Sequence, residues 1–292
     1  MWQANFVKQQ INQAFAQTEV EILGLSTQGD RDRTSSLSQL GGKGVFVKEL
    51  EYALLQGDAD IAVHSMKDVP SELPNGLGIT AICSRAEPSD ALISTGDLSF
   101  ADMPKGAVIG SSSLRRRFQL QHRYPALVFE ELRGNVDTRL KRLDEGNLDG
   151  IILATAGLQR LGLGHRICLE IPTEDCIPSA GQGAVGIESL MGRQDMSPIL
   201  AVLNDTSSFE LVSCERRISK LLGANCSLPV AAFATYVEAG TKIQLNTFVS
   251  SENGQTQLRL GDTAPIGQGG VLADRVAQAL IDQGALQLIR TD

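Results

Sequence analysis

The spacing of apolar positions changes repeatedly along the chain, between a helical period and short strand-like runs. Residues 2–15 carry apolar side chains three or four positions apart, which predicts an amphipathic helix. Compact apolar runs such as residues 150–154 predict strands. In chain order, the pattern predicts a helix at 2–15, a strand at 20–25, a helix at 45–55, strands at 60–64, 77–83, 91–94 and 107–110, a helix at 113–123, a strand at 127–130, a helix at 136–146, a strand at 150–154, a helix at 156–162, a strand at 184–188, helices at 195–203 and 208–222, strands at 229–237, 242–249 and 255–261, and a helix at 270–283.

The tail of the chain predicts a different architecture from the part before it. Strands that alternate with helices indicate βαβ units and parallel sheets, whereas the tail has successive strands in meander order and then a helix. We therefore predict an α/β protein with two α/β domains and a small C-terminal α+β domain. The expected domains are residues 1–83 with 184–201, residues 88–178, and residues 205–292. A ligand cleft would lie between the first two, at the carboxyl ends of strands.

Composition narrows the class of protein. The 292 residues carry a formal net charge of -8, which does not favour a nucleic-acid partner. No apolar run approaches the roughly 20 residues of a membrane-spanning helix, and the N-terminus has no signal or transit pattern. We therefore expect a cytoplasmic protein, or a plastid stromal one if the source is a photosynthetic eukaryote. We also expect a monomer, although composition does not bear on the oligomeric state. The five cysteines and three histidines are scattered, which argues against a disulfide framework and a metal site.

Positive charge is concentrated in residues 105–142, which hold nine basic and three acidic side chains. Within this window, Ser111 and Ser113 lie at a predicted strand-to-helix junction, where backbone N–H and hydroxyl groups can hold an anion. Arg115 and Arg116 follow, and their guanidinium groups suit carboxylates.

The next predicted strand-to-helix turn repeats this arrangement, with Arg133 at the turn and Arg139 one helical step further. A helix cap with ordinary surface arginines is the alternative reading of either turn. Two such turns in adjacent units favour a pocket for a ligand with several carboxylates.

Three other features have more than one reading. Residues 181–186 spell G-x-G-x-x-G, but no strand precedes them and a strand-like run follows, which argues against a dinucleotide site. Asp68 lies at the end of a strand, just before a proline. Its carboxylate could simply cap a turn, or it could stabilise a cationic intermediate. Cys226 lies in a loop between the predicted helix at 208–222 and the predicted strand at 229–237, and the residues alone do not distinguish a reactive from an unreactive thiol.

Taken together, the chain resembles the porphobilinogen deaminase (hydroxymethylbilane synthase) family. The resemblance runs in family order across nearly the whole chain. Its matching segments are residues 41–51, 62–70, 112–116, 132–136 with Thr138 and Arg139, 151–154 with 157–158 and 160–163, 181–188, and Cys226 with Pro229.

The resemblance implies a transferase of tetrapyrrole and heme biosynthesis that joins four porphobilinogen molecules head to tail, with loss of ammonia. It implies a dipyrromethane cofactor bound through a thioether to Cys226, and Asp68 as the catalytic carboxylate. It also implies a set of residues that bind the carboxylates of the cofactor (Ser65, Lys67, Ser111, Ser113, Arg115 and Arg116) and of the substrate (Lys43, Arg133 and Arg139, with Gln182).

Three departures from the family pattern leave alternatives open. The family has a strand and an arginine-bearing loop before the Trp2-Gln-Ala helix, and this chain opens at that helix. Asn225 replaces a glycine before the cysteine, and residues 33–36 are more polar than usual. An inactive homologue therefore stays an alternative. A second is a solute-binding module, because two α/β domains around a cleft resemble periplasmic binding proteins.

Overall fold

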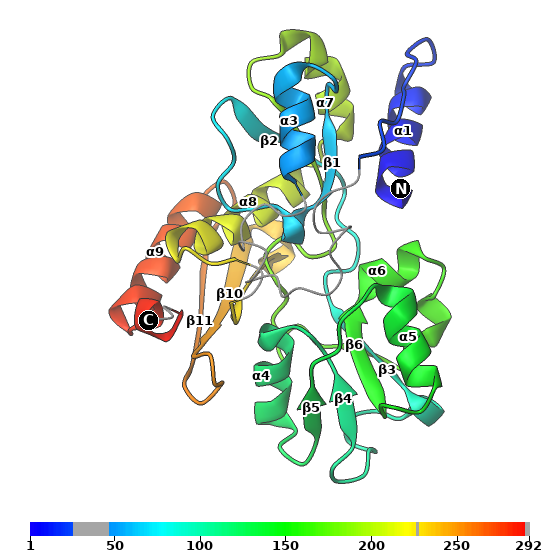
Figure 1. The fold of residues 1–292 in the computed structure, drawn as a ribbon. Coiled ribbons are helices and arrows are strands. Elements are labelled where there is room, and N and C mark those ends of the chain that lie inside the picture. Colours follow the sequence, from blue (N-terminus) through cyan, green and yellow to red (C-terminus); the bar gives the residue numbers. More distant parts are fainter. Residues whose placement is uncertain (26–46, 226–227, 290–292) are drawn as a thin grey trace.

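The computed structural model describes residues 1–25, 47–225 and 228–289. Within these residues the strands form three separate sheets, which lie in three parts of the molecule (Figure 1). Short 3-10 helices lie between several elements: η1 (Met66–Asp68), η2 (Thr95–Asp97), η3 (Gly164–Arg166), η4 (Gln194–Met196) and η5 (Glu238–Gly240).

The first sheet has the strand order β1-β8-β2, with β8 antiparallel to both neighbours. Its strands are β1 (Ala62–Ser65), β2 (Leu77–Ile82) and β8 (Val185–Leu190), and the helices of this part are α1 (Trp2–Ala14), α3 (Lys48–Gln56) and α7 (Ser197–Leu203). Apolar side chains at helical spacing on α1, Val7 and Ile11, pack with Ala81, Val185 and Ile187 of the sheet. The helical period of residues 2–15 therefore reflects a buried helix face.

The second sheet has the order β5-β4-β6-β3-β7. Its elements are β3 (Asp90–Ser94), β4 (Val108–Gly110), α4 (Leu114–Arg123), β5 (Val128–Glu130), α5 (Val136–Asp144), β6 (Gly150–Ala154), α6 (Thr155–Arg160) and β7 (Leu169–Ile171). β4 is parallel to β5 and to β6, so the strand–helix units produce adjacent parallel strands here. The turns that end β4 and β5 therefore open at one edge of the sheet.

The third sheet is an antiparallel meander in the order β11-β10-β9. Its elements are α8 (Thr206–Leu221), β9 (Val230–Val237), β10 (Lys242–Ser250), β11 (Gln257–Pro265), α9 (Gly269–Asp282) and α10 (Ala285–Ile289). Side chains of α8 and α9, among them Ile218, Leu272 and Val276, form one core with Ile243 and Leu245 of the sheet. The predicted fold class, two α/β parts and a small α+β part, is confirmed.

The prediction of parallel sheets is wrong in two places. In the first sheet β8 runs antiparallel to its neighbours, and in the second sheet β3 is antiparallel to β6 and β7. The reason is topological: β8 enters the first sheet from the second part of the chain and lies between two strands that the local pattern treats as neighbours. Alternation of strands and helices predicts each element but not the direction from which a distant strand arrives.

The predicted strand at residues 20–25 is also wrong. These residues have no strand hydrogen bonding to other described residues, and Leu23 and Leu25 are 52% and 39% exposed. An apolar run forms a strand only where it meets a partner edge. Two short elements escaped prediction, β7 and α10, because three to five residues carry too little periodicity to be recognised.

Glu215 of α8 bonds to both chain connections between the first two sheets and to the third sheet. Its carboxylate accepts hydrogen bonds from Arg85 Nη1 and Nη2 (2.6 and 3.1 Å), from the Gly181 N–H (2.7 Å) and from the Ala234 N–H (2.8 Å). Arg85 lies between β2 and β3, Gly181 lies between β7 and β8, and Ala234 is on β9. Since the Glu215 side chain is completely buried, this junction fixes α8 relative to all three sheets.

Candidate active site

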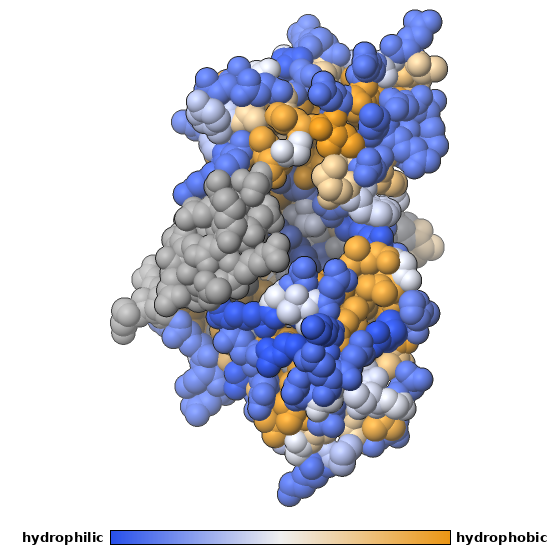
Figure 2. All heavy atoms as spheres, turned by 45° about the vertical axis from the view of Figure 1, so that its right-hand side comes forward, coloured by the Kyte–Doolittle hydropathy of each residue, from blue (hydrophilic) through white to orange (hydrophobic). Residues whose placement is uncertain are grey.

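A pocket of about 470 Å³ lies where the three parts of the molecule meet. Its lining comes from α3, the turn after β1, the start of α4, α5, and α8 with the residues that follow it. The molecular surface is hollowed between its upper and lower parts (Figure 2). The volume suits a small organic ligand.

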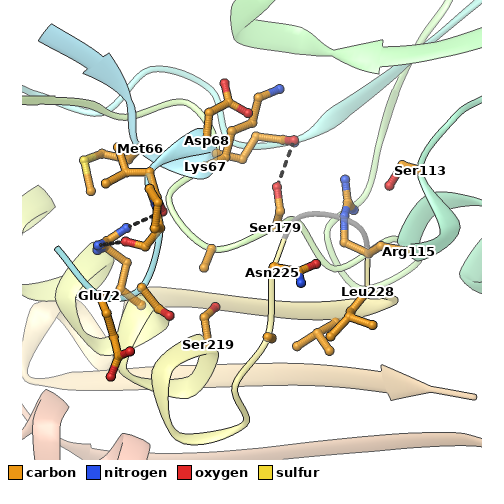
Figure 3. A pocket seen from close by; sticks show the side chains of 18 of the residues that line it. Met66, Lys67, Asp68, Glu72, Ser113, Arg115, Ser179, Ser219, Asn225 and Leu228 are labelled. Carbon is orange, nitrogen blue, oxygen red and sulfur yellow. Dashed lines mark hydrogen bonds between the residues drawn. The ribbon is translucent and has the colours of Figure 1, made fainter. Parts of the chain in front are cut away.

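The turn after β1, η1, places two predicted residues at the pocket. Arg216 of α8 donates to the carbonyl oxygens of Val69 (3.0 Å) and Pro70 (2.7 Å), directly after this turn. Lys67 and Asp68 project from one side of the pocket, and Figure 3 shows them across from the start of α4. Asp68 is exposed, whereas Lys67 is half-buried. Burial lowers the pKa of the Lys67 ammonium, and the neighbouring Asp68 charge opposes that change.

The start of α4 supplies the opposite side. Ser113 caps this helix and accepts a hydrogen bond from the Arg116 N–H (3.5 Å). Arg115 and Arg116 are only 3% and 6% exposed, and both contact the buried carboxylate of Asp90, each at 2.8 Å. Burial alone would raise the pKa of Asp90, but the two guanidinium groups hold it well below its usual range. One carboxylate against two guanidinium groups leaves one positive charge at this edge of the pocket.

Gln182 and Arg139 complete this positive side. The Gln182 amide donates to Asp90 Oδ1 (2.8 Å) and to the carbonyl oxygens of Pro88 and Ser89, so it holds the Asp90 carboxylate in place. Arg139 of α5 is half-buried, and its Nε donates to the Gly134 carbonyl (2.7 Å). Burial, with the nearby Arg116 charge, lowers the pKa of Arg139 to about 10, so its guanidinium stays charged at neutral pH.

The structure brings most of the predicted residues together. Seven of them line the pocket: Lys67, Asp68, Ser113, Arg115, Arg116, Arg139 and Gln182. Three lie elsewhere. Ser65 accepts a hydrogen bond from Gln3 of α1 (2.7 Å), Ser111 is buried behind the α4 cap, and Arg133 is exposed and paired with Glu131. Lys43 and Cys226 lie outside the described residues, but Asn225, directly before the cysteine, lines the pocket.

Sequence reasoning missed several lining residues, among them Lys48, Glu51 and Arg216. A signal existed for Glu51. It shares a helix face with Val47 and Leu54, both buried, and a carboxylate among apolar positions of an amphipathic helix is unusual. Arg216 gave no comparable signal, because its partners are backbone carbonyls distant in sequence.

The chemistry of the lining fits a pyrrole ligand with carboxylate side chains. The guanidinium groups of Arg115, Arg116 and Arg139 gather on one side, and Arg139 has no carboxylate partner among the described residues. The exposed carboxylate of Asp68 lies on the other side, where it can accept hydrogen bonds from pyrrole N–H groups. Each charge-assisted hydrogen bond of this kind contributes roughly 1.5–3 kcal/mol.

Family comparison is consistent with this geometry. Residues 1–198 match the model described as "Porphobilinogen deaminase, dipyromethane cofactor binding domain", and residues 209–280 match "Porphobilinogen deaminase, C-terminal domain". The chain belongs to the porphobilinogen deaminase family. The family resemblance expected from the motifs is thereby confirmed, together with its dipyrromethane cofactor, and residues 1–198, which contain the first two sheets, correspond to the cofactor-binding domain of the family model.

Curated porphobilinogen deaminases are similar over nearly the whole chain. The one from Laribacter hongkongensis is 45% identical over 99% of this chain and 93% of its own length. The one from Chromobacterium violaceum is 46% identical over the same shares. The one from Ralstonia nicotianae is 46% identical over 100% of this chain and 88% of its own length.

Solved structures of other proteins are similar at a lower level. The VFT2 domain of Bordetella pertussis BvgS is 17% identical over 73% of this chain and 82% of that domain, with a TM-score of 0.40. The L-cystine solute receptor of Neisseria gonorrhoeae is 15% identical over 77% of this chain and 84% of that chain, with a TM-score of 0.38. Among the described residues, no helix is long and apolar enough to cross a membrane, and no cluster of His, Cys, Asp and Glu side chains suits a metal ion.

Proposed function

We propose that this chain is a hydroxymethylbilane synthase, which condenses four porphobilinogen molecules with release of four molecules of ammonia. The observation that carries the proposal is the two-sided pocket beside Asn225: a carboxylate on the η1 turn faces a positive cluster at the start of α4. The porphobilinogen deaminase family of the chain supports the same reaction. When bound through Cys226, the dipyrromethane group supplies the pyrrole to which the first substrate is joined.

The cationic residues and the carboxylate of the pocket have different roles in the proposed reaction. Arg115, Arg116 and Arg139 hold the acetate and propionate groups of pyrrole rings, and Lys67 adds a carboxylate-binding group on the Asp68 side of the pocket. Asp68 accepts hydrogen bonds from pyrrole N–H groups and stabilises the positive charge that develops when ammonia leaves. Ser65, Ser111, Arg133 and Lys43 stay predicted carboxylate-binding residues of the same site.

The asparagine variant of Asp68 tests this function. Asp68→Asn keeps the shape and one acceptor oxygen but removes the charge, and loss of one preorganised electrostatic group lowers turnover by roughly 10²–10³-fold. Asp68→Glu should retain more activity because the charge is kept. Porphobilinogen consumption and ammonia release, measured together, should fall in parallel. Equal turnover by wild type and Asp68→Asn would contradict the assignment, and ligand binding without turnover in the wild type would favour a solute-binding module or an inactive homologue.

We also propose three domains, with the boundaries expected from the sequence (residues 1–83 with 184–201, 88–178 and 205–292), in a cytoplasmic monomer without nucleic-acid or membrane partners. Limited proteolysis should cut first near the boundaries, and sedimentation should give the 31.3 kDa of a single chain. A stable dimer would contradict the monomer.

A further inference from the structure

Glu51 is a pocket-lining carboxylate that the assignments above leave without a role. It is on α3, close to the η1 turn, and only 8% of its surface is exposed. No hydrogen bond joins its carboxylate to another side chain or backbone group among the described residues. Asp68 lines the same pocket but is exposed. The two carboxylates therefore line one pocket in different environments, which is the arrangement that separates the roles of two acids.

A buried histidine–glutamate pair lies behind Glu51. His64 Nε2 of β1 is 2.9 Å from Glu188 Oε2 of β8, and their side chains are 5% and 0% exposed. Burial and the negative charge of Glu188 raise the pKa of Glu51, while His64 and Lys48 act in the opposite direction. Arg216 of α8 also interacts with Glu188 and completes the charged groups around this cluster.

The proposed reaction needs a group that removes a proton at every condensation. The C–N bond of the aminomethyl group breaks and ammonia leaves, a C–C bond forms to the acceptor ring, and the C–H bond of that ring carbon breaks. The ring proton must go to a base and then to the released ammonia, which becomes ammonium. The positive charge leaves the acceptor ring together with this proton, so a carboxylate other than Asp68 can accept it, and Glu51 is the buried carboxylate of the pocket.

We propose that Glu51 is the base that accepts the ring proton, while Asp68 lies opposite the developing cation. The inference rests on the proposed function and adds a second carboxylate to it. A base acts best when its pKa lies near the working pH, and burial beside Glu188 shifts the pKa of Glu51 upward, in that direction. Once protonated, Glu51 returns the proton to ammonia or water in the pocket, so the residue is unchanged after each cycle.

The test is the pH dependence of kcat in Glu51→Gln, Glu51→Asp and Lys48→Met, with Asp58→Asn as control. Asp58 is an exposed acid just after α3 and outside the pocket. Glu51→Gln should lower kcat by roughly 10²-fold or more and remove the acidic limb of the profile. Glu51→Asp should keep that limb with a smaller loss. Lys48→Met removes a cation that lowers the pKa of Glu51, so the acidic limb should move to higher pH. Asp58→Asn should match wild type.

Thermal unfolding provides a readout that does not depend on activity. A carboxyl with a raised pKa binds its proton more tightly in the folded state, so its stabilisation is present at low pH and is lost as the pH rises through the folded-state pKa. Glu51→Gln lacks this loss. Its melting temperature should therefore rise relative to that of wild type as the pH increases above about 4.3.

The outcomes separate this inference from the proposed function. A wild type that consumes no porphobilinogen contradicts the proposed function. An active wild type whose acidic limb is unchanged in both Glu51→Gln and Lys48→Met overturns the role of Glu51 and leaves the proposed function intact. If Glu51→Gln does not fold, Lys48→Met still decides, because Lys48 is exposed and its replacement leaves the core untouched.

Discussion

The two basic turns of the second sheet look alike in sequence but differ in the structure. At the first turn, Arg115 and Arg116 are buried and share the carboxylate of Asp90. At the second, Arg139 lines the pocket without a carboxylate partner among the described residues, and Arg133 is exposed beside Glu131. The first turn therefore combines a structural ion cluster with ligand binding, whereas the second keeps one guanidinium available for a ligand.

Because of this difference, changes at the first turn should mainly affect folding stability, and changes at the second should mainly affect affinity for the ligand. A buried guanidinium is tolerated only with a charged partner, so the first turn should control whether the second sheet folds. A half-buried guanidinium without such a partner costs less to keep and gains more when a carboxylate arrives. The variants below address the two turns in order of expected effect.

The largest effect should come from Asp90→Asn. Removal of one partner from a buried ion pair costs about 3–5 kcal/mol, and here two guanidinium groups lose their counter-charge. The free energy of unfolding, measured with urea, should fall by that amount, while the exposed Asp58→Asn should stay within about 0.5 kcal/mol of wild type. An Asp90→Asn protein as stable as wild type would show that the first turn does not depend on this carboxylate.

The same cluster predicts how stability depends on pH. The folded-state pKa of Asp90 is depressed, so its stabilisation is fully present above the unfolded value of about 3.9 and is lost as the pH falls through the folded value. The difference in unfolding free energy between wild type and Asp90→Asn should therefore shrink only below about pH 4. Urea unfolding at a series of acidic pH values measures it. A difference that already shrinks between pH 7 and 5 would assign the effect to another group.

Arg139→Met should have a smaller and different effect. Loss of a charge-assisted contact of roughly 1.5–3 kcal/mol corresponds to a KM raised about tenfold or more, with little change in unfolding free energy. Arg139→Lys should recover only part of the affinity, because an ammonium cannot form a two-pronged contact. Steady-state kinetics with porphobilinogen measure both variants. A loss of stability with an unchanged KM would place Arg139 with the first turn instead.

Arg133→Leu should give the smallest change. To bind a substrate carboxylate Arg133 must leave Glu131, so its net contribution to affinity is reduced, and its exposed ion pair contributes only about 0–1 kcal/mol to stability. The rise in KM should be smaller than that for Arg139→Leu in a parallel assay. An equal or larger rise would show that Arg133 binds carboxylates as directly as Arg139.

The comparison also shows how far the sequence predicts the molecule. Local periodicity located nearly all helices and strands, and the junction of Ser113 with α4 followed from its capping chemistry. The pairing of Asp90 with Arg115 and Arg116 was not predictable, because Asp90 lies just before the predicted strand at 91–94 and no local pattern links it to residues 115 and 116. Three further features depend on residues far apart in sequence: the position of β8 between β1 and β2, the contact of Arg216 with the residues after η1, and the junction around Glu215. No local pattern encodes such contacts.

Intact-protein mass spectrometry of wild type and Cys226→Ser tests the central claim most directly, with turnover measured on the same samples. The account predicts that the wild type has a mass above that of its sequence by one covalent dipyrromethane, and that it consumes porphobilinogen. Cys226→Ser should have the bare sequence mass and no turnover. A wild type without added mass that still turns over, or an added mass retained in Cys226→Ser, would contradict the account.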